Sequence, residues 1–131
     1  MPYRQRLIIE GFGCRKNLDK PGFAHMFLER LTSALDMRVL VPPIIVRVPV
    51  ANPAPGLETK DLGVTGFVVW MESGAQVHTW PGNRLATLDA YSCKEFRPGK
   101  ALDLFEKSFS PILNSPWILP TKQTSAPRPA T

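Results

Sequence analysis

The chain has 131 residues, of which 44% are hydrophobic, and a formal net charge of +5, which predicts one domain with a small core. No apolar run approaches the roughly 20 residues of a membrane span or forms a signal-peptide core, so we expect a cytoplasmic protein without membrane contact. The 16 Lys and Arg residues are scattered and are not interleaved with aromatic residues, which argues against nucleic-acid binding.

The first part of the chain predicts a strand, a helix and a second strand. Alternating apolar residues predict a strand over residues 4–12. Pro21 suits the first turn of a helix, and apolar residues at helical spacing continue to about Asp36. A β-branched run then predicts a strand over residues 38–48. Pro42 and Pro43 inside it indicate a bend or a place at the sheet edge.

The second part follows a loop rich in proline and glycine over residues 49–62. Its elements are strands over 63–71, 75–80 and 85–93, a helix from Pro98 ended by Pro111, and a short strand over 117–119. This order predicts an α+β fold, a two-layer sandwich in which two helices cover one face of a mainly antiparallel sheet. We expect one domain over residues 1–120 and a disordered tail over residues 121–131.

Three residues beside these strands are candidates for chemistry. Ser73 is a potential nucleophile, His78 is a base with a near-neutral pKa, and Cys93 is a potential proton donor. Each also has an ordinary structural interpretation, as a turn serine, a hydrogen-bonded core histidine and a buried cysteine. Asp89 and Tyr91 share a strand face with Cys93 by alternation, which indicates that this face borders a polar site.

The two cysteines and two histidines offer no metal site. Cys14 and Cys93 are far apart in sequence and are expected to be free thiols in a cytoplasmic protein. His25 and His78 do not have the spacing of metal ligands, and no Cys-x-x-Cys pair occurs. The candidate residues therefore point to nucleophilic and acid–base chemistry without a metal.

This part of the sequence resembles the small prokaryotic branch of the S-adenosylmethionine decarboxylase family. The family patterns Glu-Ser-His, His-Thr-Trp-Pro-Glu and Asp-x-Phe-x-Cys correspond to Glu72-Ser73, His78-Thr79-Trp80-Pro81 and Asp89-Ala90-Tyr91-Ser92-Cys93, with fitting gaps between them. The resemblance covers roughly residues 6–109. Three positions depart from it: Gly74 and Gly82 replace the family's histidine and glutamate, and Thr59 stands where a phenylalanine stacks on adenine.

The resemblance implies a self-processing, pyruvoyl-dependent decarboxylase of polyamine biosynthesis that acts on S-adenosylmethionine. The Ser73 hydroxyl would attack the carbonyl of Glu72, and cleavage of this bond would leave Ser73 as a covalent pyruvoyl group that forms a Schiff base with the substrate. In this comparison His78 is the processing base, Thr65 assists processing, and Cys93 protonates the product. No metal is implied.

The resemblance also suggests substrate contacts and an assembly. Glu10 and Glu72 correspond to substrate-contacting acids, while Glu58 and Asp61 could face a cationic substrate. The loop over residues 49–62 holds no aromatic residue, which leaves L-arginine or L-ornithine as alternative substrates. A further alternative is an uncleaved homologue that regulates a partner enzyme. The family implies a homodimer whose sites are shared across a twofold interface, with Ser73 and Cys93 facing the Thr65 and His78 of the other chain.

Overall fold

The computed structural model describes residues 4–47 and 63–119. Its elements are β1 (Gln5–Phe12), α1 (Pro21–Ala34), β2 (Val39–Arg47), β3 (Val64–Trp70), β4 (Ser73–Trp80), β5 (Leu85–Ser92), α2 (Pro98–Phe109) and β6 (Leu113–Leu119). Neither of these two helices is long and apolar enough to cross a membrane. Glu58, Asp61, Thr59 and the tail over residues 121–131 lie outside the described residues.

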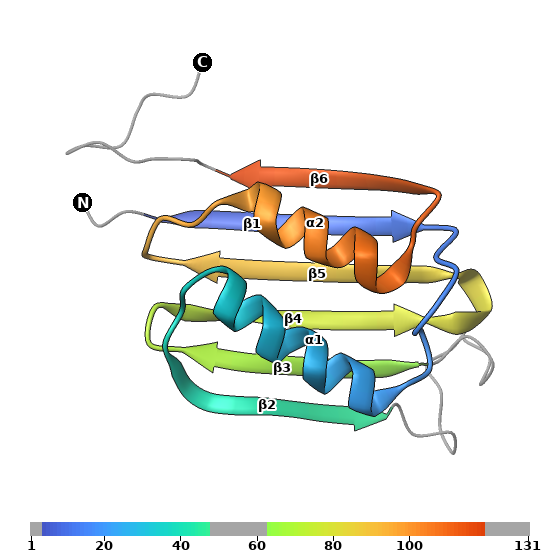
Figure 1. Ribbon diagram of the computed structural model, residues 1–131, viewed down its shortest axis with the longest axis horizontal. Helices are drawn as coiled ribbons and strands as arrows, with labels where there is room; N and C mark the ends of the chain where they lie inside the picture. Colours follow the sequence, from blue (N-terminus) through green and yellow to red (C-terminus); the bar gives the residue numbers. More distant parts are fainter. Residues whose placement is uncertain (1–3, 48–62, 120–131) are drawn as a thin grey trace, which may run out of the picture.

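The six strands form one sheet in the order β2-β3-β4-β5-β1-β6, and every neighbouring pair is antiparallel. Both helices lie on the same face of this sheet (Figure 1), and they contact each other. The predicted two-layer α+β sandwich is therefore confirmed. The first strand of the chain is inserted between the last two, β5 and β6, so both halves of the sequence build the same sheet.

The two edge strands carry the prolines. In β2 the register with β3 shifts between Val39 and Val41 and again between Val41 and Ile44, around the Pro42-Pro43 pair. This agrees with the predicted edge position, since proline cannot donate a ladder hydrogen bond. At the opposite edge β6 contains Pro116 and begins at Leu113, four residues before the predicted strand. The first helix ends at Ala34, two residues before the predicted end.

The core lies between the helices and the sheet. Alternate strand residues such as Ile9, Val77 and Leu88 are fully buried there, as the period of two in a strand requires. The helices meet them with aromatic residues, and the ring centroids of Phe105 and Phe109 are 5.1 Å apart. Burial of each such side chain contributes about 1.5–3 kcal/mol. The core thus joins the sheet to a single layer of helices.

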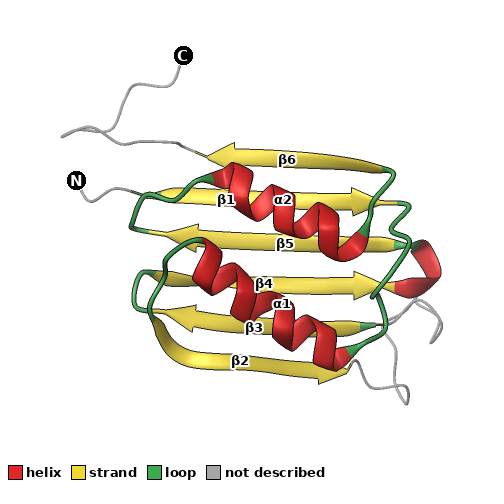
Figure 2. Cartoon of the chain, viewed as in Figure 1, coloured by secondary structure: helices red, strands yellow, loops and turns green. Residues whose placement is uncertain are grey.

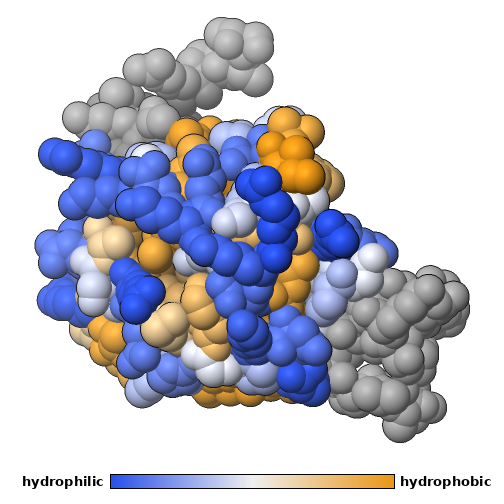
Figure 3. All heavy atoms as spheres, turned by 45° about the vertical axis from the view of Figure 1, so that its right-hand side comes forward, coloured by the Kyte–Doolittle hydropathy of each residue, from blue (hydrophilic) through white to orange (hydrophobic). Residues whose placement is uncertain are grey.

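The other face of the sheet, here named the open face, has no described element over it (Figure 2). Strand residues that alternate with the core point to this face, and many are apolar. Those between 37% and 65% exposed are Phe12, Ile44, Val46, Phe67, Tyr91, Leu113, Trp117 and Leu119. Figure 3, turned 45° from the view in which the helices lie in front of the sheet, shows another part of the surface, where hydrophilic residues in blue lie among apolar patches in orange. Monomeric proteins rarely expose an apolar surface as extended as the open face.

Candidate active site

Ser73 lies at a strained point of the backbone. It is the first residue of β4, and its φ of 145° is one that residues with a side chain rarely adopt. Such a conformation costs about 1–3 kcal/mol and persists where the surrounding structure enforces it. At the next residue, Gly74, a Cβ atom would lie 2.5 Å from the carbonyl oxygen of Val68. The structure therefore gives a reason for glycine at position 74, and it extends the predicted strand back to Ser73.

Glu72 is fixed at both its carbonyl and its carboxylate. Its main-chain oxygen accepts a hydrogen bond of 3.0 Å from the Cys93 amide. Glu72 as a whole is only 5% exposed. Its carboxylate accepts hydrogen bonds from the Arg38 main-chain amide at 3.1 Å and from Arg38 Nε at 2.9 Å. The hydrogen bond from the Arg38 amide is the largest cause that lowers the pKa of Glu72. The peptide bond between Glu72 and Ser73 is thus held from its N-terminal side.

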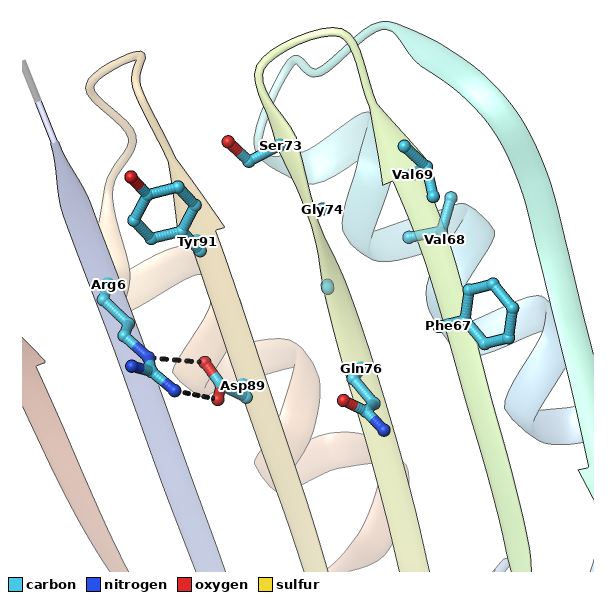
Figure 4. A pocket seen from close by; sticks show the side chains of 10 residues that line it. Arg6, Phe67, Val68, Val69, Ser73, Gly74, Gln76, Asp89 and Tyr91 are labelled. Carbon is cyan, nitrogen blue, oxygen red and sulfur yellow. Dashed lines mark hydrogen bonds and ion pairs between the residues drawn. The ribbon is translucent and has the colours of Figure 1, made fainter. Parts of the chain in front are cut away.

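Beside Ser73, the open face has a pocket of about 520 Å³. Its lining residues include Ser73, Gly74 and Gln76 of β4, Asp89 and Tyr91 of β5, Arg6 of β1 and Phe67 of β3. Figure 4 shows the Ser73 hydroxyl directed from β4 toward β5, and Arg6 facing Asp89. The guanidinium of Arg6 makes two bonds to the Asp89 carboxylate, at 3.0 and 2.6 Å. A ligand in this pocket would touch the candidate nucleophile and a neutralised ion pair.

A second group of polar residues surrounds His78 on the open face. Thr65 Oγ1 lies 2.8 Å from His78 Nδ1, and Gln76 Nε2 lies 2.8 Å from His78 Nε2. The ring also stacks on Trp80, with centroids 5.5 Å apart. Burial lowers the pKa of His78 below its ordinary value, which keeps the imidazole neutral and able to accept a proton. The geometry suits a general base that has a hydroxyl beside it.

The strand register assigns the candidate residues to two rows across the sheet. Thr65 pairs with His78, His78 pairs with Thr87, and Thr87 pairs with Glu10. Glu10 therefore belongs to the same row as the imidazole. Ser73 and His78 are five residues apart in the same unbroken strand. At the rise per residue of an extended chain, this places them about 16 Å apart. The structure does not bring Ser73 and His78 of one chain together.

Cys93 lies one residue beyond the row of Ser73, and its main-chain amide bonds the main-chain oxygen of Glu72. It directly follows Ser92, the cross-strand partner of Ser73, and is an exposed free thiol just beyond the end of β5. Cys14 is free as well, so the prediction of two free thiols is confirmed. Asp89 and Tyr91 do share the face that borders the pocket, whereas Cys93 lies past the strand. The candidate nucleophile and the candidate proton donor are thus near the same end of the sheet.

Three residues near the candidate groups were not identified from the sequence. Arg38 holds Glu72, Arg6 pairs with Asp89, and Gln76 contacts His78. A signal for Gln76 was present, because it and His78 are two residues apart in a strand and so share a face. The other two contacts join residues that are distant in sequence, and they depend on a strand order that the sequence pattern did not reveal.

Comparisons with known proteins identify the family of the chain. The pattern of the family described as S-adenosylmethionine decarboxylase matches residues 5–113. An S-adenosylmethionine decarboxylase proenzyme of Pyrococcus horikoshii is 45% identical over 49 residues, which are 37% of this chain and 35% of that protein. The corresponding proenzyme of Aquifex aeolicus is 49% identical over 39 residues, 30% of this chain and 27% of that protein.

The fold has a counterpart among solved structures. The adenosylmethionine decarboxylase of Aquifex aeolicus superposes with a TM-score of 0.70 and 19% sequence identity, covering 98% of this chain and 97% of that one. At this identity the superposition supports the fold alone, whereas the family pattern spans most of the sequence. The chain belongs to the S-adenosylmethionine decarboxylase family.

Proposed function

We propose that the chain cleaves its own Glu72–Ser73 bond and then works as a pyruvoyl-dependent decarboxylase of S-adenosylmethionine. The observation that carries this proposal is the strained backbone at Ser73, whose φ is 145°, next to a carbonyl that already accepts a hydrogen bond from the Cys93 amide. Strain at a residue with a side chain is often stored where chemistry occurs. Cleavage at this bond would release it.

The self-cleavage begins with attack of the Ser73 Oγ on the carbonyl carbon of Glu72. The carbonyl oxygen gains negative charge, and the Cys93 amide, 3.0 Å away, is a preorganised donor for it. Breaking the C–N bond then gives an ester on Ser73 and a free amine. Removal of the Ser73 α-proton by a base forms a Cα=Cβ double bond and expels the Glu72 carboxylate. Tautomerisation and hydrolysis of the resulting enamine leave a pyruvoyl group and ammonia.

The surroundings of Ser73 fit such a group. Residue 73 lies at the border of an open pocket, where a small molecule could reach it without displacement of the core. A pyruvoyl group supplies an electron sink for the pair left behind when a carboxylate departs as CO2. The thiol of Cys93, exposed near this end of the sheet, would deliver the proton that replaces the carboxylate.

The separation of the two rows supports a site shared between two chains. The proposed base, His78, is about 16 Å from the Ser73 of its own chain, which is too far for proton transfer. A second copy packed on the open face would provide the missing half. Such a homodimer would also cover the exposed apolar residues of that face, for example Phe67 at 37% and Trp117 at 56% exposure.

The choice of substrate follows the family, since proenzymes named for S-adenosylmethionine align with this chain. The second candidate is L-arginine or L-ornithine, favoured by the loop over residues 49–62, which has no aromatic residue to stack on adenine. Glu10 and the acids Glu58 and Asp61 would then be candidate contacts for a cationic side chain. Release of CO2 from each of the three amino acids in parallel decides between them.

Mass spectrometry of the purified chain tests the proposal. We expect fragments 1–72 and 73–131, the second blocked at its N-terminus by the pyruvoyl group. The Ser73→Ala chain should stay whole because it lacks the attacking hydroxyl. A wild-type chain that keeps its intact mass after prolonged incubation would contradict the enzyme proposal and would favour the uncleaved regulatory homologue.

A further inference from the structure

Gln76 lies on β4 between the candidate nucleophile Ser73 and the candidate base His78. Its side chain lies beside His78 on the open face of β4, and the two residues alternate with the buried Ala75, Val77 and Thr79. The Gln76 Nε2 atom is 2.8 Å from His78 Nε2. The other ring nitrogen, Nδ1, is 2.8 Å from Thr65 Oγ1. Both nitrogens of the imidazole are therefore engaged, each by a different kind of partner.

The two partners do not have the same freedom. A threonine hydroxyl can donate or accept a hydrogen bond, whereas the amide nitrogen of glutamine can only donate. A neutral imidazole carries one donor and one acceptor nitrogen. Because Gln76 Nε2 donates, His78 Nε2 has to accept, so the ring proton lies on Nδ1. The Nδ1–H then donates to the Thr65 oxygen, and the Thr65 hydroxyl hydrogen is directed to a third group.

We infer that Gln76 is a positioning residue that holds His78 in its neutral Nδ1–H tautomer, and that this tautomer selects Nε2 as the proton-accepting nitrogen and Thr65 as a hydrogen-bond donor. The inference rests on the self-cleavage proposed above. Gln76 is exposed, so its amide can give way when the Ser73 ester of a second chain approaches Nε2. The acceptor lone pair is thereby kept on the open face.

The assigned tautomer gives each group one task. In the elimination step Nε2 takes the α-proton of the ester, the C–H electrons form the Cα=Cβ bond, and the Glu72 carboxylate leaves with the C–O electrons. The Thr65 hydroxyl, supplied with a bond from Nδ1–H, can donate to the ester carbonyl, which becomes more negative as the proton departs. With the opposite tautomer, Thr65 would donate to the ring and would be lost to the ester.

The residues of β5 that lie opposite this pair do not decide which nitrogen of His78 carries the proton. Asp89 lies opposite Gln76 in the strand register, and its carboxylate is already bonded twice by Arg6. Thr87, opposite His78, is uncharged. The amide of Gln76 is therefore the polar group on β4 that distinguishes one ring nitrogen from the other. Exchange of that amide for a carboxylate reverses the direction of the hydrogen bond with almost no change in shape.

Nitrogen NMR of the imidazole tests the inference directly. The sample is the full-length uncut Ser73→Ala chain with 15N-labelled histidine, near pH 8, with His25→Gln to assign the two rings. We expect a protonated Nδ1 and an unprotonated Nε2 for His78. Gln76→Glu should move the proton to Nε2, since the carboxylate only accepts, and Gln76→Met should give a mixture. Thr87→Val, the matched control on β5, should leave the tautomer as it was.

The rate of self-cleavage gives the second measurement. In chains with Ser73 intact, Gln76→Glu should slow the conversion of ester to cleaved product about tenfold, the effect of one hydrogen bond. A His78 that carries its proton on Nε2 while Gln76 is present, or a tautomer unchanged in Gln76→Glu, would overturn the inference. If the tautomer is as assigned but the wild-type chain never cleaves, the proposed function fails and the role of Gln76 in holding the ring remains established.

Discussion

The two ends of β4 are built in different ways. At its start, Ser73 has a strained φ and its neighbour Glu72 is held by main-chain and side-chain donors from Cys93 and Arg38. Five residues further, His78 has an ordinary extended backbone, and its ring is held by side chains of Thr65 and Gln76. The first end holds strain in the φ torsion of Ser73, and the second end orients an imidazole.

Under the proposed function, this difference gives each chain two incomplete halves of a site. The end at Ser73 offers a hydroxyl and a polarised carbonyl without a base, and the end at His78 offers a base without a nucleophile. An antiparallel arrangement of two chains across their open faces would bring opposite ends together, as twofold symmetry requires of a self-complementary interface.

Mixing two inactive variants should restore cleavage. Ser73→Ala lacks the nucleophile and His78→Ala lacks the base, so neither chain alone should yield the two fragments. In a mixed dimer one site contains Ser73 from the His78→Ala chain and His78 from the Ser73→Ala chain. We expect the His78→Ala chain to split after residue 72, as seen by intact mass. Separately tagged chains report whether subunits have exchanged.

The contrary result is equally informative. Confirmed exchange without any cleavage would mean that each site is built within one chain, and the shared-site proposal would have to be abandoned. A sample that contains only Ser73→Ala chains, handled in the same way, controls for hydrolysis that is unrelated to the site. We expect no fragments in this control and accumulating fragments in the mixture of the two variants.

Cys93→Ala should separate processing from turnover. Self-cleavage should continue, because the bond to the Glu72 carbonyl comes from the main-chain amide of residue 93, which alanine retains. Decarboxylation by the cleaved protein should fall about 10²-fold or more, the contribution of a positioned general acid. Fragment mass and CO2 release are measured on the same sample. Cys14→Ala, a buried cysteine, is the control, and equal turnover in all three chains would show that the Cys93 thiol is not the proton donor.

Arg38→Met should weaken the Ser73 end by a small, pH-dependent amount. The main-chain donor remains and the Arg38 side chain is 73% exposed, so we expect a loss of about 0.5–1 kcal/mol in unfolding free energy at pH 7. The folded-state pKa of Glu72 is lowered. Its stabilisation is therefore present above the ordinary carboxyl pKa of about 4.3 and disappears as the pH falls through the lower folded value.

Urea unfolding of the uncut Ser73→Ala chain, with and without Arg38→Met, measures this effect at several pH values. The gap between the two curves should begin to narrow as the pH falls below the ordinary carboxyl pKa of about 4.3. It should close at lower pH, as Glu72 of the folded chain takes up its proton. Arg30→Met, which removes an exposed arginine of α1, should show no such closure. A gap that stays constant with pH would show that Arg38 acts through packing and not through the Glu72 carboxylate.

The sequence allowed the elements to be predicted because each has strong local features. Pro21 and Pro98 begin the two helices, and alternation defines the central strands. The Pro42-Pro43 pair correctly indicated an edge strand. The start of β4 was placed two residues late, because Ser73 and Gly74 resemble turn residues and their pairing with Trp70 and Val69 depends on the neighbouring strand.

The sequence indicated candidate residues for a site but not their contacts. Ser73, His78 and Cys93 were selected by residue type and by the family resemblance, and their roles stay predictions. The bond between Arg38 and Glu72 joins residues 34 positions apart, and the pair of Arg6 with Asp89 spans 83 positions. The first contact depends on β2 lying next to β3, and the second depends on β1 lying next to β5. Strand order is set by packing of the whole sheet and not by any local segment.

The strand order has a consequence for what cleavage would produce. A cut after Glu72 would leave β1, β2 and β3 in one polypeptide and β4, β5 and β6 in the other, yet β1 lies between β5 and β6. The two fragments would be interleaved within a single sheet and could not separate without unfolding. Refolding, a reaction of one molecule before the cut, would become an encounter of two. The stability of the mature protein would then depend on its concentration, so maturation would convert a folding problem into an assembly problem.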